Sequence, residues 1–214
     1  MRLRTKIQLA LLDNLVWVLL AVFFIANAFF TPAFLGMKNQ LNILYQSATL
    51  GLLVLGMGIV MMVGELDLSM EATLAFAPGV TILVAQQLGL GPAVCIFMTL
   101  ALGVAVGFFN GFFVAKMKTN SFLLTMSSQI VMRGLVLFLV PFSLAGLDKG
   151  YTFLGRGRIG SLQIAILALI VIYIIFEFVF HKTVFGRKFA LTGGNRRAAY
   201  ISGINTDRVI ICAF

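Results

Sequence analysis

Charged residues are scarce in this sequence. They make up 11% of the 214 residues, whereas a soluble globular domain has roughly 25%. Hydrophobic residues make up 61%, and the mean hydropathy is +1.06. So few charges cannot cover the surface of a soluble fold of this size. The composition therefore excludes a soluble globular protein and favours a membrane protein.

Cysteine and histidine are nearly absent as well. Cys95 and Cys212 lie inside apolar stretches and are too few for a disulfide framework or a metal site. The single histidine, His181, ends an apolar run beside Lys182, so a serine nucleophile would lack a histidine base. No other nucleophile with a general base stands out. We therefore predict a protein that is not an enzyme, with no catalytic residues, no metal and no cofactor.

Long apolar segments divide the chain. They run at about residues 14–31, 43–63, 72–88, 92–115, 121–145 and 162–180. Each is close to the ~20 residues that a helix needs to cross a bilayer. Lipid offers the backbone no hydrogen-bond partners, so segments that are apolar throughout predict helices rather than the alternating strands of a barrel. The predicted fold is an all-α, polytopic transmembrane bundle with about six complete spans.

The basic residues form clusters between the apolar segments. Their net charge of +9 is not a single solvated patch, which argues against nucleic-acid binding. Because basic residues resist translocation, the clusters predict orientation. If the N-terminus is cytoplasmic, the inner set is Arg2, Arg4, Lys6, Lys116, Lys118, Lys182, Arg187, Lys188, Arg196, Arg197 and Arg208, and the outer set is Lys38, Lys149, Arg156 and Arg158. We predict a multi-pass protein of the inner (plasma) membrane, with a cytoplasmic N-terminus.

Both ends of the chain have a second interpretation. The basic start, the apolar run from Leu15 to Ile25 and Ala26-Asn27-Ala28 resemble a signal peptide, but the run continues through Phe29 and Phe30, which favours a span. At the other end, only Val209–Phe214 remain of a seventh apolar helix that would need about 20 residues to span. We therefore expect a chain that is incomplete at its C-terminus.

Residues 64–71 place three carboxylates between the second and third apolar segments. The following segment is short and interrupted by Pro78-Gly79, a pattern typical of a discontinuous helix. In one interpretation this is an ordinary loop, in which Asp67 or Ser69 caps the next helix and Glu71 complements its dipole. In the other, the helix starts inside the protein and lines a polar route for a solute. The spacing supports both equally.

Three glycines recur at every fourth position of the fourth segment. Gly103, Gly107 and Gly111 give a smooth helix face, which predicts close packing against another helix. Asn110 lies beside the last of them. Its side chain is expected either to donate an interhelical hydrogen bond or to touch a polar solute.

Arg133 lies inside the fifth apolar segment, twelve residues after Ser121. An arginine at mid-bilayer costs at least ~2.5 kcal/mol, so it needs a carboxylate, carbonyl groups or a wet cavity. Asp67 is one candidate partner. The alternative is a span that begins late, with Arg133 near an interface.

The cytoplasmic segment after the sixth span predicts a short helix between turns. Asn195 is a good N-cap, Arg196–Ser202 make two turns, and Gly203 can end them in the left-handed conformation. A second cap, at Asn205 or Thr206, starts the next apolar helix. Such a rigid projection suits the docking of another protein. The alternative is a surface loop whose basic residues only fix the topology.

This cytoplasmic segment carries a family resemblance. Residues 185–208 closely resemble the cytoplasmic loop of permeases from the ribose, xylose, galactose and autoinducer-2 group of ATP-binding-cassette importers. Ala198-Ala199 followed by Gly203 is similar to the core of the EAA loop, by which such permeases hold their ATPase.

Two further motifs of that family follow in the expected order. Leu66-Asp67-Leu68-Ser69 resembles its Gly-Gly-Ile-Asp-Leu-Ser-Val-Gly signature, and Asn110-Gly111 through Thr125 to Arg133-Gly134-Leu135 resembles its Asn-Gly to Thr to Arg-Gly-Leu signature. The resemblance thus covers nearly the whole chain.

The chain also departs from the family pattern. Glu65 replaces the second glycine of the first signature, Glu71 replaces the glycine after its valine, and Asn120-Ser121 stands where a proline pair is usual. Arg196-Arg197 replaces the usual Pro-Glu before Ala-Ala. This last change puts two cations in place of an anion at the predicted docking surface.

The resemblance implies the permease subunit of an importer for a monosaccharide or similar small polar solute. Residues 1–214 would form a single transmembrane permease domain, with a coupling loop at 181–208. The implied partners are an ATP-binding-cassette subunit, a second permease copy or paralogue, a periplasmic solute-binding protein and membrane lipid. The coupling residues would be Gly193, Gly194, Asn195, Ala198, Ala199 and Gly203, and the translocation path or its support would comprise Asp67, Ser69, Asn110 and Arg133.

The alternative function is an ion- or proton-coupled secondary transporter. It would use Asp67 and Arg133, together with Glu65 and Glu71, as a titrating set inside the membrane. ATP dependence of uptake distinguishes the two functions.

Overall fold

The computed structural model describes residue 9, residues 11–140 and residues 149–214. Two compact units, residues 1–46 and residues 47–214, make up the chain. The first contains α2 (Leu15–Phe30) and the beginning of α3 (Met37–Met62). Within it, the Phe24 and Phe34 rings meet edge to face, with centroids 5.3 Å apart.

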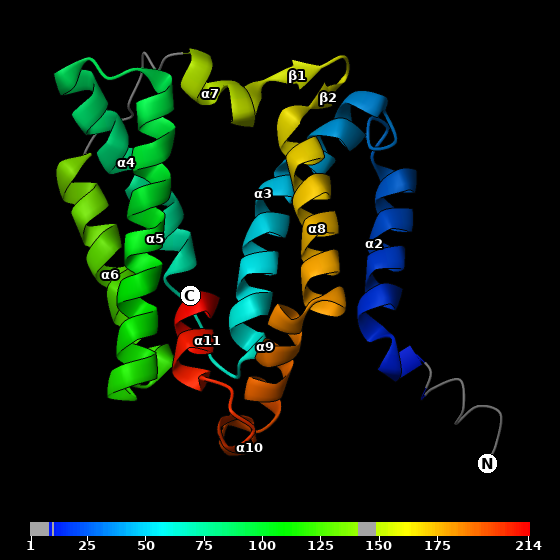
Figure 1. Ribbon diagram of the computed structural model, residues 1–214. Helices are drawn as coiled ribbons and strands as arrows, with labels where there is room; N and C mark the ends of the chain where they lie inside the picture. Colours follow the sequence, from blue (N-terminus) through cyan, green and yellow to red (C-terminus); the bar gives the residue numbers. More distant parts are fainter. Residues whose placement is uncertain (1–8, 10, 141–148) are drawn as a thin grey trace. The chain divides into compact units, whose positions relative to one another are not determined.

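The second unit holds the rest of α3 and the later elements (Figure 1). Its further helices are α4 (Met70–Leu88), α5 (Pro92–Met117), α6 (Ser121–Leu139), α7 (Lys149–Arg156), α8 (Ile164–Lys182), α9 (Val184–Gly194), α10 (Arg196–Ile201) and α11 (Thr206–Ala213). Between α7 and α8, β1 (Arg158–Ile159) and β2 (Leu162–Gln163) form an antiparallel hairpin with Arg158 opposite Gln163. The predicted helical membrane bundle is confirmed.

Not every predicted span forms a helix long and apolar enough to cross a membrane. Each of the predicted apolar segments contains one long helix, and 4 of these helices are long and apolar enough to cross a membrane: α3, α5, α6 and α8. α2 is apolar but has 16 residues, and α4 is not among the four. In the fifth predicted segment the helix ends at Leu139, and residues 141–145 lie outside the described residues.

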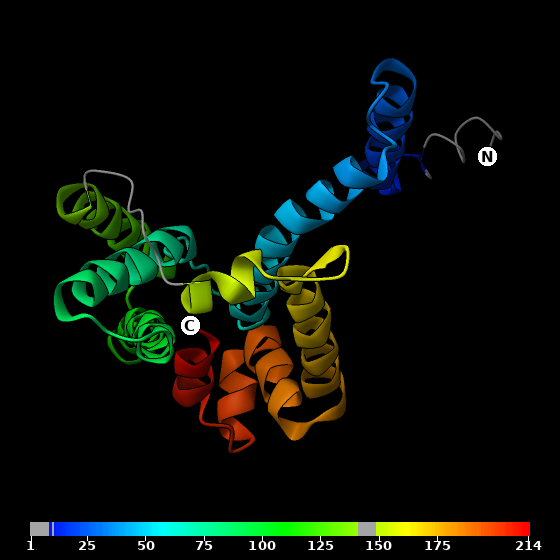
Figure 2. The same ribbon diagram turned by 90° about the horizontal axis from the view of Figure 1, so that it is seen from above.

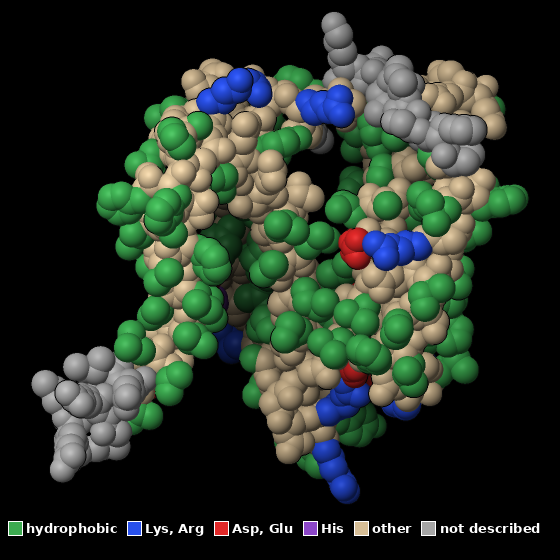
Figure 3. Space-filling view, turned by 180° about the vertical axis from the view of Figure 1, so that it is seen from behind, with side chains coloured by type: hydrophobic (Ala, Val, Ile, Leu, Met, Phe, Trp, Pro, Cys, Tyr) green, Lys and Arg blue, Asp and Glu red, His purple; other side chains and the backbone are tan. Residues whose placement is uncertain are grey.

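Apolar side chains cover the outside of these helices. In α8, for example, Ile166 is buried, whereas Ile170, Ile174 and Phe178 are exposed. Hydrophobic side chains spread over the face of the second unit shown in Figure 3, and Lys and Arg gather mainly toward its upper and lower ends. A surface of this kind is stable in lipid, where apolar groups need no burial inside the protein.

Pro78 does not interrupt α4. The helix is continuous from Met70 to Leu88 with Pro78 inside it, so the predicted break at Pro78-Gly79 is wrong. Proline removes one backbone hydrogen bond, a loss that a membrane helix packed against neighbours tolerates. The discontinuity lies earlier, in the turn and irregular chain of residues 63–69 before α4.

Two groups of helices surround residues 63–69. α4, α5 and α6 pack together, and α11 packs along α5 (Figures 1 and 2). α9 contacts α8, α10 and α11. One buried cluster joins Val63 to Phe189, Val209 and Ala213, so the end of α3 is held by α9 and α11.

Candidate functional site

Residues Val63–Ser69, here called the 63–69 segment, connect α3 to α4 by a turn at Val63 and Gly64 and then by irregular chain. Side chains at alternate positions point inward: Val63, Asp67 and Ser69 are buried, and Glu65 is half-buried. Gly64 and Leu66, at the positions between, are exposed. One side of the segment thus faces the protein interior.

The backbone of the 63–69 segment is paired by side chains of α6. The Leu66 N–H donates to Ser121 Oγ at 3.2 Å, and the Leu68 N–H donates to Thr125 Oγ1 at 3.1 Å. Non-helical backbone at membrane depth is stable only where the protein itself satisfies its polar groups. Ser121 and Thr125 perform this role, which explains why both hydroxyls are buried.

A chain of polar side chains joins the segment to α5 and α6. Asp67 Oδ1 accepts hydrogen bonds from the Ser69 backbone N–H at 2.8 Å and from the Ser69 hydroxyl at 2.5 Å. Ser69 Oγ accepts from Asn110 Nδ2 at 2.9 Å, and Asn110 Oδ1 accepts from the Ser128 hydroxyl at 2.8 Å. Asn110 lies seven residues before Met117, the last residue of α5. Because a helix rises about 1.5 Å per residue, the network lies about 10 Å from that end of α5.

The capping interpretation holds in part, because Asp67 Oδ1 accepts the Ser69 backbone N–H just before α4 and Glu71 lies in the first turn of α4. Ser69 occupies the N-cap position of α4 but makes no side-chain cap hydrogen bond. The Asp67 carboxylate is used by Ser69 itself, and Glu71 is engaged elsewhere. Asp67 and Ser69 are therefore placed as parts of a buried polar network at the start of a broken helix.

A cavity of about 400 Å³ opens beside this network. Its wall is mostly apolar, with polar groups at Asp67, Ser69, Thr73 and Thr99. The other lining residues are Leu53, Met70, Leu74, Ala77, Pro78, Leu100, Gly103, Val104, Val106, Gly107 and Phe214. A small number of polar groups in an apolar, concave wall is the usual composition of a small-molecule site.

Arg133 is not part of this cavity wall. Its Nη2 pairs with Glu71 Oε1 at 2.9 Å, so the ion pair forms with Glu71 rather than with Asp67. Gln129 Nε2 also donates to Glu71, at 3.4 Å. Both charged side chains are exposed on the outer side of α4 and α6, where mutual neutralisation lowers the cost of placing them in a membrane.

The glycines of α5 divide into two roles. A Cβ at Gly107 would collide with the carbonyl of Phe214, and one at Gly111 would lie 3.0 Å from Ile211 Cα, so α11 approaches α5 at these positions. An added Cβ at Gly103 would meet no atom within 4 Å. The predicted helix packing thus applies to Gly107 and Gly111, whereas Gly103 lines the cavity.

The predicted short helix and its caps are present. Asn195 Oδ1 accepts from the Ala198 N–H at 2.9 Å and caps α10. Gly203 has φ +81°, and the Ile204 N–H closes the turn onto the Ala199 carbonyl. Asn205 then caps α11, accepting from the Arg208 N–H at 3.0 Å. Ala199 is buried, and Ala198 is exposed.

The eleven-residue helix α9 was not predicted. Thr183 caps α9, and the buried Phe189 lies on its apolar side. The apolar pattern of this helix is short, so the sequence was interpreted as a loop. Gly193 lies against the end of α3, because a Cβ there would collide with the Met62 carbonyl. At Gly194 an added Cβ would meet no atom within 4 Å. Gly193 therefore permits close packing, and Gly194 ends the helix.

Comparison with known proteins identifies the family. Residues 39–214 match the family model described as branched-chain amino acid transport system / permease component. The chain belongs to this permease family. No solved structure matches it.

Similar curated permeases carry sugar names. The chain is 33% identical to the ribose import permease protein RbsC of Bacillus subtilis (strain 168) over 188 residues, covering 86% of this chain and 58% of the relative. It is 32% identical to the L-arabinose transport system permease protein AraH of Escherichia coli (strain K12), covering 92% and 60%. For the xylose transport system permease protein XylH of the same strain, identity is 27%, covering 93% and 67%. The chain thus spans about 60% of the length of RbsC and AraH.

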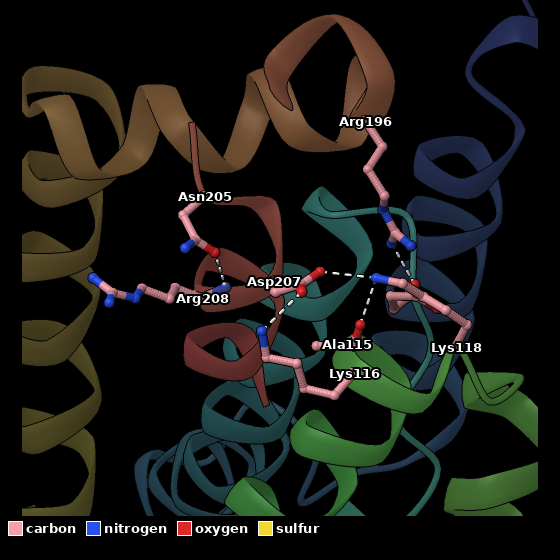
Figure 4. Close-up of polar contacts among 8 residues, drawn as sticks. Ala115, Lys116, Lys118, Arg196, Asn205, Asp207 and Arg208 are labelled. Carbon is pink, nitrogen blue, oxygen red and sulfur yellow. Dashed lines mark hydrogen bonds and ion pairs between the residues drawn. The ribbon is translucent and has the colours of Figure 1, made fainter. Parts of the chain in front are cut away.

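In this permease, an ionic contact between α5 and α11 was also missed by sequence reasoning (Figure 4). Asp207 Oδ2 pairs with Lys116 Nζ at 3.0 Å, and Asp207 Oδ1 pairs with Lys118 Nζ at 2.8 Å. The hydrogen bond from Lys118, with a smaller contribution from Lys116, holds the pKa of the Asp207 carboxyl below its usual range. The partners lie 91 and 89 residues apart, so no local pattern pointed to them.

Proposed function

We propose that this permease is the membrane-spanning subunit of an ATP-driven importer for a monosaccharide or similar small polar solute. The observation that carries the proposal is a buried polar segment, 63–69, which lines a cavity at one end and contacts the α9–α11 region at the other. The relatives are named as permeases for ribose, L-arabinose and xylose, which supports a sugar as the solute.

The cavity suits a neutral polyol. Its polar groups are one carboxylate and three hydroxyls, which can donate and accept hydrogen bonds, and its apolar wall can face the C–H side of a sugar ring. The described residues of the wall include no Lys or Arg, which favours a neutral over an anionic solute. Asp67 and Ser69 would contact the solute, and Asn110 would hold Ser69 in place.

α10 is proposed as the docking site of a separate ATPase. Tyr200 is 71% exposed and Ile201 is 77% exposed, both on a helix fixed by caps at its two ends. Exposed aromatic and aliphatic side chains on a rigid projection suit insertion into a partner's groove. ATP-driven closure of the ATPases would move α10 and shift the permease between inward and outward openings.

The remaining parts of the assembly follow from the same proposal. A second permease copy or paralogue would complete the pathway, and a periplasmic solute-binding protein would deliver the solute on the outer side. Lys116 and Lys118, at the end of α5, pair with Asp207 at the start of α11, which supports one common side for these two helix ends. We place the N-terminus in the cytoplasm of a cell with an inner membrane, on the distribution of basic residues.

Transport assays test this function directly. The full-length gene product, its ATPase and its receptor are reconstituted in proteoliposomes with radiolabelled D-ribose, L-arabinose or D-xylose. We expect uptake of one of these sugars that needs ATP and the receptor. Uptake that persists without ATP, driven by a proton gradient, would reject the importer in favour of a secondary transporter.

A further inference from the structure

One ion pair connects the proposed docking helix to the proposed solute site. Arg196 Nη2 donates to Glu65 Oε1 at 2.5 Å across 131 residues of sequence. Arg196 is the first residue of α10, and Glu65 precedes Asp67 by two residues. Figure 4 shows the Arg196 side chain reaching from α10 to its acceptor, near the end of α5 that carries Lys118.

This pair is more enclosed than an ordinary surface ion pair. The Glu65 side chain is 14% exposed and the Arg196 side chain is 39% exposed. Solvent screens the two charges less than it would at the surface, and removal of either partner leaves the other charge partly buried and uncompensated. The pair therefore constrains where the 63–69 segment can lie relative to α10.

Further contacts of the α9–α11 region reach the start of the segment. Gly193 packs on Met62, and Val63 lies in the cluster with Phe189 and Val209. Glu65 is the next inward-pointing position, and a single residue, Leu66, separates it from Asp67. A displacement of α10 can therefore reach Asp67 through Glu65, which lies two residues before it.

The same two residues are departures from the family pattern described above. Glu65 stands in place of a glycine, and Arg196 stands in place of the proline of Pro-Glu. Viewed along the sequence they are unrelated changes. In the fold they are partners, so a cation at the start of α10 has its counter-charge within the same chain.

We propose that Glu65 and Arg196 are a positioning pair that transmits the movement of α10 to Asp67 and Ser69 in the cavity. This inference rests on the proposed function, because it assigns the pair a part in coupling ATP hydrolysis to transport. The pair touches neither the solute nor the nucleotide. It acts by moving the 63–69 segment as α10 moves.

The pair is tested in the complete importer, with uptake of the transported sugar and ATP hydrolysis measured on the same proteoliposomes. Glu65→Gln and Arg196→Gln each remove one charge. We expect each to lower the sugar taken up per ATP hydrolysed by about tenfold, within the usual range of coupling between sites, while hydrolysis stays close to wild type. Arg158→Gln is the matched control, since it removes an exposed arginine of β1, outside both the docking helix and the cavity wall, and should leave the ratio unchanged.

Two rescues separate a transmitting pair from two independent structural residues. The exchanged pair, Glu65→Arg with Arg196→Glu, should recover most of the ratio. In a cysteine-free background, Glu65→Cys with Arg196→Cys should be uncoupled when reduced and recoupled by a short bis-methanethiosulfonate reagent, reversibly with dithiothreitol.

The outcomes that overturn the inference are distinct from those that overturn the function. Single variants with a wild-type ratio would reject the pair alone, as would failure of both rescues or an equal loss in Arg158→Gln. If the wild-type importer takes up none of the three sugars in response to ATP, the proposed function fails and this inference fails with it.

Discussion

Thr125 illustrates how single side chains hold the site together. Its hydroxyl is fully buried, accepts a hydrogen bond from the Leu68 N–H at 3.1 Å and donates to the Ser121 carbonyl at 2.7 Å. It thus serves two backbones at once, that of its own helix and that of the 63–69 segment. An unpaired backbone N–H inside a membrane protein has no water to replace the lost partner.

Thr125→Val should therefore destabilise the protein although it preserves volume. We expect a loss of about 1–3 kcal/mol, the cost of an unsatisfied buried donor, and reduced uptake. Thermal unfolding in detergent measures the first effect. Thr125→Ser should retain most of the stability, and Ser127→Ala, whose hydroxyl bonds only its own helix at 2.8 Å, is the control. Equal stability of Thr125→Val and wild type would show that the hydroxyl does not hold the segment.

Asp207 gives a dependence on pH. Because its pKa is lower in the folded protein than the ordinary 3.8, the ion pairs stabilise the fold fully above that value and lose their effect as the pH falls through the folded pKa. Asp207→Asn should lower Tm at pH 7 by about 1–3 °C, a small change because the pairs are largely exposed. The difference between variant and wild type should persist down to about pH 4 and shrink below it. A difference that grows at low pH would contradict the assignment.

At the scale of elements, the helices α9, α10 and α11 form one joined unit. Caps at Asn195 and Asn205 and the turn at Gly203 fix their directions, and the cluster around Phe189 attaches them to the end of α3. A movement of α10 is therefore expected to displace the neighbouring helices, because the connections between them are fixed.

Gly203→Val should uncouple transport without preventing membrane insertion. The residue has φ +81°, a conformation that a β-branched side chain adopts only under strain. We expect sugar uptake per ATP to fall at least about fivefold, the lower end of typical coupling. Gly194→Ala is the control, because an added Cβ there meets no atom within 4 Å. Normal coupling in Gly203→Val would show that the turn geometry is dispensable.

At the scale of the whole molecule, the decisive property is the side of the membrane on which each end of the bundle lies. The basic residues predict that α10 is cytoplasmic and that the β1–β2 hairpin is external. Both carry exposed side chains suited to labelling, Tyr200 and Ile159. The proposed coupling requires these two positions to lie on opposite sides.

Cysteine labelling measures this arrangement. With Cys95 and Cys212 replaced by serine, Tyr200→Cys should react with a membrane-impermeant maleimide in inside-out vesicles and stay unlabelled in intact spheroplasts. Ile159→Cys should show the reverse pattern. Labelling of Tyr200→Cys from outside would reject both the topology and α10 as the docking site of a cytoplasmic ATPase.

The sequence by itself determined the properties that depend on local pattern and composition. Continuous apolarity predicted the membrane helices, because lipid satisfies no backbone hydrogen bond. Asn195, Gly203 and Asn205 predicted the caps and the turn around α10, because those conformations are set within a few residues. The family motifs pointed to Asp67, Ser69 and Asn110. They did not predict the hydrogen bonds that connect these side chains.

Only the tertiary structure decided which distant groups meet. It joined Asp67 through Ser69 to Asn110, paired Arg133 with Glu71, and brought Glu65 to Arg196. It also moved the break in the helix from Pro78 to the 63–69 segment. Pairing energies depend on distance and burial in space, which residue spacing along the chain does not encode once the partners lie dozens of residues apart.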